Sequence, residues 1–113
     1  MRGFPLRKFL QGFILLFLFM GCAKKDIPLP DHPGGQLYSG IARKAIRCVK
    51  CHGTRGEGKF SAPALVVSGK TMPSEKFTVT VLKGRGRMPR FEDLLTKEEI
   101  AQIIDWLEKV SPL

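Results

Sequence analysis

Cys48-Val49-Lys50-Cys51-His52 lies near the middle of a chain of 113 residues. Two thiols three positions apart, followed directly by an imidazole, form the signature of c-type haem attachment. Each sulfur can form a thioether with one haem vinyl group, and His52 can then ligate the iron. The motif therefore predicts haem c, one copy, attached covalently through Cys48 and Cys51.

Three other uses of this motif fit the sequence less well. A zinc site needs four ligands in a tetrahedron, and the adjacent Cys51 and His52 cannot easily both reach one ion. A thioredoxin-like redox pair needs a strand before it, whereas the residues around Cys48 have a helical pattern. A disulfide between the two cysteines would close a very small loop and would leave His52 without a role. Haem attachment is therefore the interpretation that uses all three side chains.

A second axial ligand is expected downstream of the motif. The stretch Gly84-Arg85-Gly86-Arg87-Met88-Pro89 offers a thioether, and Met opposite His is the ligand pair that raises a haem potential. Met72, which also precedes a proline, is the competing candidate. Only Met88 follows a pair of glycines that would let the backbone approach the haem edge, so the sequence favours His52 and Met88 as the iron ligands.

The composition limits the chain to one small basic domain. It contains 19 Lys and Arg residues against 10 Asp and Glu residues, and its length leaves no room for two domains. Domains of this size bury little apolar surface, so a covalently held haem would be a large part of the core. We expect residues 36–113 to form this domain.

The amino terminus has the parts of an export signal. Arg2, Arg7 and Lys8 precede an apolar run over 13–20 that is too short for a comfortable membrane span. Gly21-Cys22 at its end resembles the lipobox of bacterial lipoproteins, in which the cysteine becomes the acylated first residue. An uncleaved anchor, or ordinary cleavage that leaves a free thiol at Cys22, are the alternatives.

These features predict a signal peptide over 1–21 and a lipid-anchored linker over 22–35, which has three prolines and no helical period. His32 lies in this linker and is expected to be a solvated loop residue. The predicted location is the periplasm or an extracytoplasmic face, with the membrane contacted through the lipid on Cys22.

Helical spacing of apolar residues predicts a first helix over 36–50 and a last helix over 96–110. Gly40 marks a possible close helix contact in the first, and Thr96-Lys97-Glu98-Glu99 forms a capping box at the start of the last. Residues 74–83 alternate partly like a strand, but Gly84 after them suits a helix end, so a helix is predicted.

The motifs, in this order, resemble a class I cytochrome c over residues 36–110. The resemblance implies an all-α fold of three to four helices around one haem, in which the first and last helices cross. It also implies His52 and Met88 as axial ligands, a Pro63 carbonyl that orients His52, and Trp106 in the aromatic position of the last helix. Lys44 stands where the family has an aromatic residue, which leaves Tyr38 or Ile41 to fill that space.

With both axial positions occupied, the iron has no place for substrate, so the chain is predicted to be an electron carrier and not an enzyme. A haem-binding sensor or minor peroxidase and the cytochrome subunit of a dedicated dehydrogenase are the alternatives. Twelve basic residues lie between Arg43 and Arg90 against only Glu57 and Glu75. This charge predicts an acidic redox protein or a membrane oxidoreductase as partner of a monomer, and export excludes nucleic acid.

Overall fold

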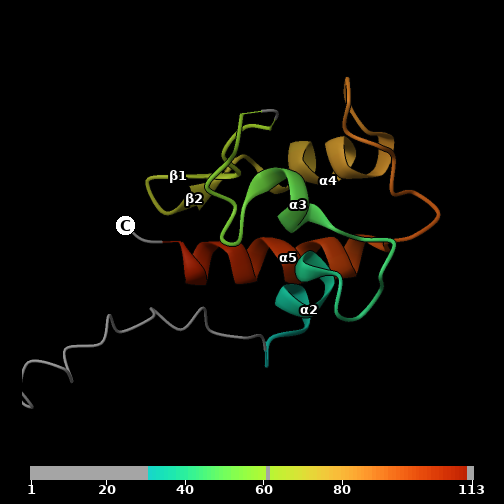
Figure 1. Cartoon of the computed structure of the whole chain (residues 1–113), viewed down its shortest axis with the longest axis horizontal. Coiled ribbons are helices and arrows are strands. Elements are labelled where there is room, and N and C mark those ends of the chain that lie inside the picture. Colours follow the sequence, from blue (N-terminus) through green and yellow to red (C-terminus); the bar gives the residue numbers. More distant parts are fainter. Residues whose placement is uncertain (1–30, 61, 112–113) are drawn as a thin grey trace, which may run out of the picture.

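The structure is a computed structural model that describes residues 31–60 and 62–111. Within these ranges it contains four helices and one two-stranded antiparallel sheet (Figure 1). In chain order they are α2 (Pro33–Ser39), α3 (Cys48–His52), β1 (Val66–Val67), β2 (Lys70–Thr71), α4 (Ser74–Lys83) and α5 (Lys97–Val110). The predicted signal peptide, most of the predicted linker and Cys22 lie outside the described residues. No helix among the described residues is long and apolar enough to cross a bilayer.

The small sheet makes the fold mostly helical and not strictly all-α. Ser68 and Gly69 join its two strands, and both have positive φ, of 51° and 74°. This conformation matches the twist of a two-residue hairpin, so the local backbone favours strands here. Thr71 then attaches the hairpin to α5, because its N–H and hydroxyl donate to the Glu108 carboxylate at 3.1 and 2.9 Å.

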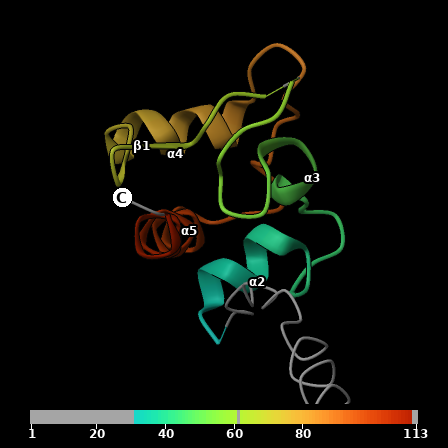
Figure 2. The same cartoon turned by 60° about the vertical axis from the view of Figure 1, so that its left-hand side comes forward.

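Helices α2 and α5 cross at close range. Figure 2 views α5 almost end-on, with α2 running across below it. A side chain at Gly34 would overlap the Gln102 carbonyl group and would lie 2.8 Å from the Ile103 nitrogen, so only glycine allows this approach. The crossing buries the Tyr38 and Trp106 rings against each other, with centroids 5.0 Å apart. The predicted crossing of first and last helices is confirmed, but the glycine at the contact is Gly34 and not Gly40.

The predicted helix over 36–50 is wrong in its extent, because the chain breaks into α2 and α3. Gly40 ends α2 in the left-handed conformation, and its N–H donates to the Leu37 carbonyl. The loop over 40–47 then turns inward to bury Ile46 completely, while Ile41 stays 58% exposed. The apolar stripe that suggested one long helix is therefore divided between two elements.

The predicted linker end and the solvated His32 are also corrected by the structure. Helix α2 begins at Pro33, a favoured residue for the first helical position. His32 is its N-cap, and its Nδ1 accepts a hydrogen bond from the Gly34 N–H at 3.1 Å. Its Nε2 lies 2.8 Å from the Asp105 carboxylate on α5, so this histidine joins the two crossing helices.

The predictions for the last two helices are confirmed. Helix α4 covers Ser74–Lys83, and α5 begins with the full capping box. The Glu99 N–H donates to the Thr96 hydroxyl at 3.1 Å, and the Thr96 N–H donates to the Glu99 carboxylate at 2.9 Å. The buried face of α5 forms much of the core, through Ile100, Ile103, Trp106 and Leu107.

Candidate haem-binding site

Helix α3 places both cysteines of the attachment motif on one helical turn, three residues apart, where side chains lie on the same side of a helix. Both are free thiols, and Cys48 packs partly buried against the core while Cys51 is exposed. Burial raises the pKa of the Cys48 thiol to about 11. A thioredoxin-like pair follows a strand, whereas α3 follows the loop over 40–47, so the thioredoxin-like alternative does not fit.

His52 follows on the same turn with only 7% of its surface exposed. Its Nδ1 lies 2.9 Å from the Pro63 carbonyl oxygen. A carbonyl can only accept a hydrogen bond, so Nδ1 carries the proton and Nε2 keeps its lone pair. This arrangement is the one that metal-bound histidines usually adopt, and it confirms the predicted contact with Pro63.

The loop after His52 is held by a further set of hydrogen bonds. The buried Tyr38 hydroxyl donates to the Gly53 carbonyl at 2.6 Å, and the Gly58 N–H donates to the His52 carbonyl at 2.7 Å. Burial also raises the pKa of Tyr38, which keeps the hydroxyl protonated as a donor. The Glu57 carboxylate accepts the Arg55 N–H at 2.7 Å, and these backbone bonds help to lower its pKa against the opposing effect of burial.

Two of these contacts were not predicted from the sequence. Tyr38 was a candidate only for filling space, although a tyrosine in place of a purely apolar ring is itself a signal for a hydrogen bond. Glu57 follows Gly56 in a glycine-rich turn, where an acidic side chain often accepts backbone N–H groups. Burial decides between the two candidates for the aromatic position, because Tyr38 is fully buried and Ile41 is exposed.

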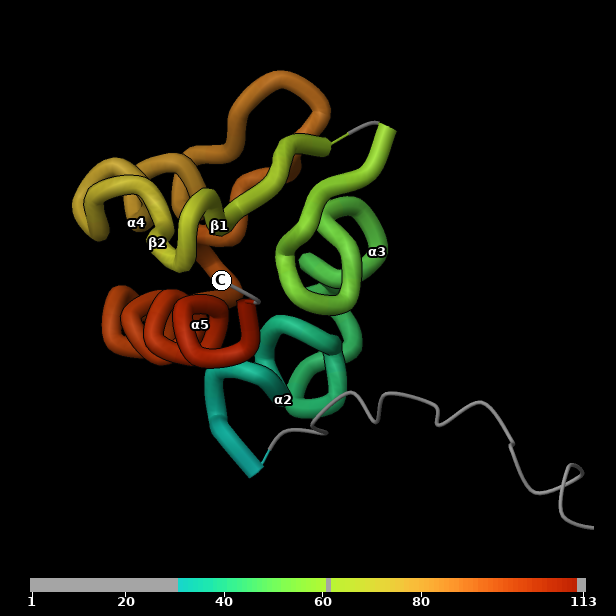
Figure 3. The backbone as a smooth tube through the Cα atoms, turned by 90° about the vertical axis from the view of Figure 1, so that its left-hand side faces the viewer, coloured from blue at the N-terminus to red at the C-terminus, as the bar shows by residue number. Residues whose placement is uncertain are grey.

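Met88 is presented by a tight turn after α4. Met88 and Arg85 exchange two backbone hydrogen bonds, of 2.9 and 3.2 Å. Gly84 has φ of +72°, and a side chain there would lie 2.6 Å from the Met88 carbonyl oxygen. Figure 3 shows the orange segment that contains this turn and the green helix α3 as separate parts of the backbone, both higher in the view than α5. Met88 packs partly buried against the core, whereas Met72 is 38% exposed.

The residues present fit a covalently attached haem. The site offers two free thiols on one turn, an imidazole nitrogen with its lone pair available, and a thioether on a separate turn. Apolar side chains that are only partly buried against the core, including Leu65 and Leu82, could cover a large flat ring. Among the described residues no group of three or more His, Cys, Asp or Glu side chains could hold a metal ion.

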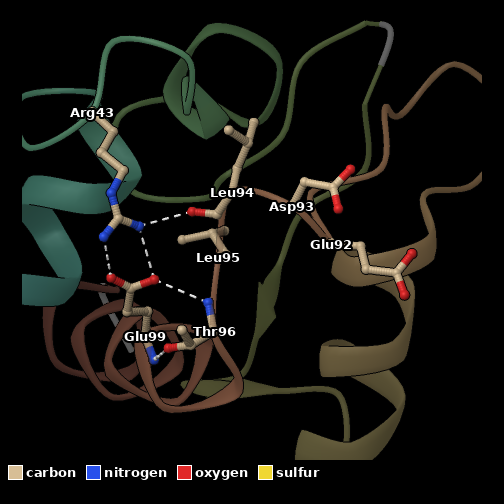
Figure 4. A pocket seen from close by; sticks show the side chains of 7 residues that line it. All are labelled: Arg43, Glu92, Asp93, Leu94, Leu95, Thr96 and Glu99. Carbon is tan, nitrogen blue, oxygen red and sulfur yellow. Dashed lines mark hydrogen bonds and ion pairs between the residues drawn. The ribbon is translucent and has the colours of Figure 1, made fainter.

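A surface pocket lies at the amino end of α5, lined by Arg43, Glu92, Asp93, Leu94, Leu95, Thr96 and Glu99 (Figure 4). Its polar groups are already paired. The Arg43 guanidinium donates to both oxygens of Glu99, at 2.5 and 2.8 Å, and to the Leu94 carbonyl at 2.8 Å. These bonds tie the loop over 40–47 to α5. The pocket thus serves the fold and is not a second candidate site.

Glu99 should give this fold a dependence on acid pH. Hydrogen bonds from Arg43 and from the Thr96 N–H lower the pKa of Glu99 from 4.5 to about 2. A lowered folded-state pKa contributes stability above the unfolded value, and that stability is lost as the pH falls through the folded value. Glu99→Gln, which keeps the capping box but loses the charge, should therefore be less stable than wild type at pH 6, and the gap should close between pH 4.5 and 2.

Denaturant unfolding at a series of pH values measures this gap. Glu98→Gln is the matched control, because it removes a charge from the same turn of α5 without touching Arg43. A gap for Glu99→Gln that stays constant from pH 6 to pH 2 would contradict the assignment.

Comparisons with known proteins agree with this geometry. A protein-family model described as "Cytochrome C oxidase, cbb3-type, subunit III" matches residues 35–107. Cytochrome c-555 from Methylococcus capsulatus is 42% identical over 62 residues, which are 55% of this chain and 48% of that protein. The chain thus matches about half the length of this curated relative. No solved structure matches the chain.

Proposed function

The chain belongs to the cytochrome c family described by the cbb3-type subunit III model, and we propose that it carries single electrons between redox partners at the periplasmic side of a membrane. The observation that carries this proposal is the state of the His52 imidazole, which directly follows a free cysteine. Its Nδ1 donates a hydrogen bond to the Pro63 carbonyl, so its Nε2 is available as a ligand. Haem c, when bound, would supply a reversible one-electron couple.

The proposal gives each residue of the site a role. Cys48 and Cys51 would hold the haem as thioethers, and His52 and Met88 would supply the nitrogen and sulfur ligands of its iron. Because these two side chains would saturate the iron, the bound haem would supply reversible electron transfer and no site for substrate. Pro63 keeps the imidazole oriented, and Tyr38 fixes the backbone at Gly53 directly after it.

A cytochrome subunit of a larger oxidoreductase is the second candidate. It gains support from the family model, whose printed description is a subunit of an oxidase. A sensor or peroxidase is less well supported. The Met88 turn is closed by two backbone hydrogen bonds and flanked by Arg85 and Arg87, whose guanidinium groups offer hydrogen-bond donors but no acceptor for a proton.

Replacing Met88 with alanine tests the ligand assignment. The oxidised protein should lose its sulfur-to-iron charge-transfer band, and its reduction potential should fall, because the thioether that favours reduced iron is gone. Absorption spectroscopy and protein-film voltammetry measure the two effects. Met72→Ala is the matched control and should change neither. The reverse pattern, with the band lost only in Met72→Ala, would show that the other methionine is the ligand.

We further propose that Cys22 is the lipidated amino terminus of the mature chain. Mass spectrometry of the membrane fraction should show a diacyl or triacyl Cys22 with no residues before it. Cys22→Ser should move the protein to the soluble fraction while its haem spectrum stays unchanged. Recovery of an intact chain that begins at Met1, or of an unmodified Cys22, would contradict the lipid anchor.

The proposed partner is an acidic redox protein or a membrane oxidoreductase that meets a cytochrome monomer. The basic charge between Arg43 and Arg90 supports this choice, because long-range attraction speeds the encounter of oppositely charged proteins. Arg90 contributes less than its charge suggests, since it lies 3.2 Å from Glu92 and 3.8 Å from Asp93.

A further inference from the structure

Phe60 exposes its whole side chain to solvent, at 114% of the reference area. Among the residues that the structure describes, the other exposed large apolar side chains keep part of their surface covered, the next being Val67 at 70%. A single exposed apolar side chain is common in proteins and needs no explanation by itself. The exposure of Phe60 gains significance from its position, because the turn that carries it is attached to the haem-binding helix.

Phe60 stands on a turn that is fixed to the haem-binding helix. Lys59 and Ala62 close the turn with two backbone hydrogen bonds, of 2.9 and 3.1 Å. The Gly58 N–H donates to the His52 carbonyl, and the Lys59 ammonium group donates to the Lys50 carbonyl at 3.3 Å. The turn therefore holds Phe60 close to α3, on which Lys50 and Cys51 are both exposed.

A second turn projects from the same end of the molecule. Figures 1 and 2 show the yellow-green turn over 58–60 and the orange turn over 85–88 at the upper end, while α2 begins at the lower end. The chain enters the domain at that lower end, where a lipid tether would attach. The end that carries both turns thus lies opposite the start of α2.

The cations on these two turns and on α3 are not neutralised. Lys50, Lys59, Arg85 and Arg87 form no ion pair within residues 31–60 and 62–111, in contrast to Arg90. An exposed aromatic ring at the same end of the molecule as these cations is the complement of an apolar pocket rimmed by carboxylates. Aromatic anchors in pockets carry much of the binding energy at protein interfaces, while surrounding charges set the encounter rate.

We propose that Phe60, framed by Lys50, Lys59, Arg85 and Arg87, is the anchor by which this chain docks on a redox protein that presents an apolar pocket rimmed by carboxylates. The inference rests on the proposed electron-carrier function and adds the surface used and the chemistry of the partner. It also gives the two kinds of side chain different roles. The cations raise the rate at which the two proteins meet, and the Phe60 ring stabilises the complex once it has formed.

The test measures how fast the reduced cytochrome is oxidised by membranes of the source bacterium from which its own gene has been deleted. The full matured chain carries Cys22→Ser throughout, so that no lipid contributes to binding. Phe60→Ser should raise KM about tenfold, the effect of a typical interface anchor, and leave kcat unchanged. Ile41→Ser removes a comparable exposed apolar side chain from the loop over 40–47 and should change KM less than about twofold.

Two further measurements separate the ring from the charges and from damage to the site. Arg87→Glu, which leaves the bond between Lys59 and Lys50 in place, should raise KM and flatten its dependence on ionic strength. Phe60→Ser should keep the salt dependence of wild type, because exposed charges are screened over about 10 Å at 0.1 M salt. Oxidation by ferricyanide and the haem spectrum should be the same in wild type, Phe60→Ser and Ile41→Ser.

Several outcomes would overturn the docking surface. An unchanged KM in Phe60→Ser, or an equal rise in Ile41→Ser, would show that Phe60 is not the anchor. Binding to phosphatidylglycerol vesicles that depends on Phe60, with an unchanged KM, would assign the ring to the membrane instead. If ferricyanide but not the membranes oxidised wild type, the docking surface would fail while the redox site stood. If neither ferricyanide nor the membranes oxidised the wild-type protein, the electron-carrier function itself would be contradicted.

Discussion

Cys48→Ala combined with Cys51→Ala is expected to abolish all haem that survives acid extraction. The two thiols lie on one turn of α3, and no other cysteine is present among the described residues to replace them. A small domain that loses a large apolar core element should also lose most of its folded population. Haem staining after denaturing electrophoresis measures the covalent bond, and the pyridine haemochrome spectrum distinguishes two thioethers from one.

Cys22→Ser is the control for this experiment, because it removes the third cysteine of the chain without touching α3. It should retain the full haem stain. Each single variant at Cys48 or Cys51 should leave at most one thioether and a shifted haemochrome band. Full staining in the double variant would contradict the attachment motif and with it the proposed function.

Gly34→Ala is expected to cost on the order of 3 kcal/mol of folding stability, at the upper end of what overpacking usually costs. The new methyl group would overlap the Gln102 carbonyl and approach the Ile103 nitrogen at 2.8 Å, and both are backbone atoms of a regular helix that cannot move aside alone. The α2–α5 crossing would have to open, which would expose Tyr38 and Trp106. Denaturant unfolding of the holoprotein, followed by Trp106 fluorescence, measures the loss.

Gln102→Ala is the matched control for this crossing. It keeps the backbone carbonyl that Gly34 approaches and truncates only an exposed side chain, so it should change the stability by less than about 0.5 kcal/mol. Equal stability of Gly34→Ala and wild type would show that the two helices cross less closely than the structure has them.

Features that depend on neighbours in the chain could be predicted from the sequence alone. The attachment motif needs only the spacing of Cys48, Cys51 and His52, and the start of α5 needs only Thr96 and Glu99 at capping-box spacing. Helix α4 ends before Gly84 as expected, because a residue with positive φ stops a helix. The local pattern alone allowed two roles for Pro63, an ordinary loop proline or a carbonyl that orients His52. The resemblance to class I cytochromes c favoured the second role.

The features that the sequence did not reveal depend on contacts between distant residues. The apolar spacing of residues 37–48 suits one long helix, but burial of Ile46 and the pairing of Arg43 with Glu99 stabilise a break at Gly40. His32 caps α2 through the nearby Gly34 N–H, but only the fold brings its other ring nitrogen to Asp105 on α5. Gly34 and Gly40 both lack a side chain, so the sequence gives either one as a place where two helices could meet closely. Only the position of Gln102 in the fold shows that the contact is at Gly34.

Tertiary structure also decided how the parts of the site support one another. Sequence spacing identifies His52 as a ligand, but the buried hydroxyl of Tyr38 reaches Gly53 only because α2 packs across α5. In the same way, the turns that present Phe60 and Met88 are 28 positions apart and project from one end of the molecule only after folding. The sequence by itself determined the chemistry of attachment, because bonds to haem need only local geometry. The surface that meets a partner required the fold, because it is assembled from side chains that are neighbours only in space.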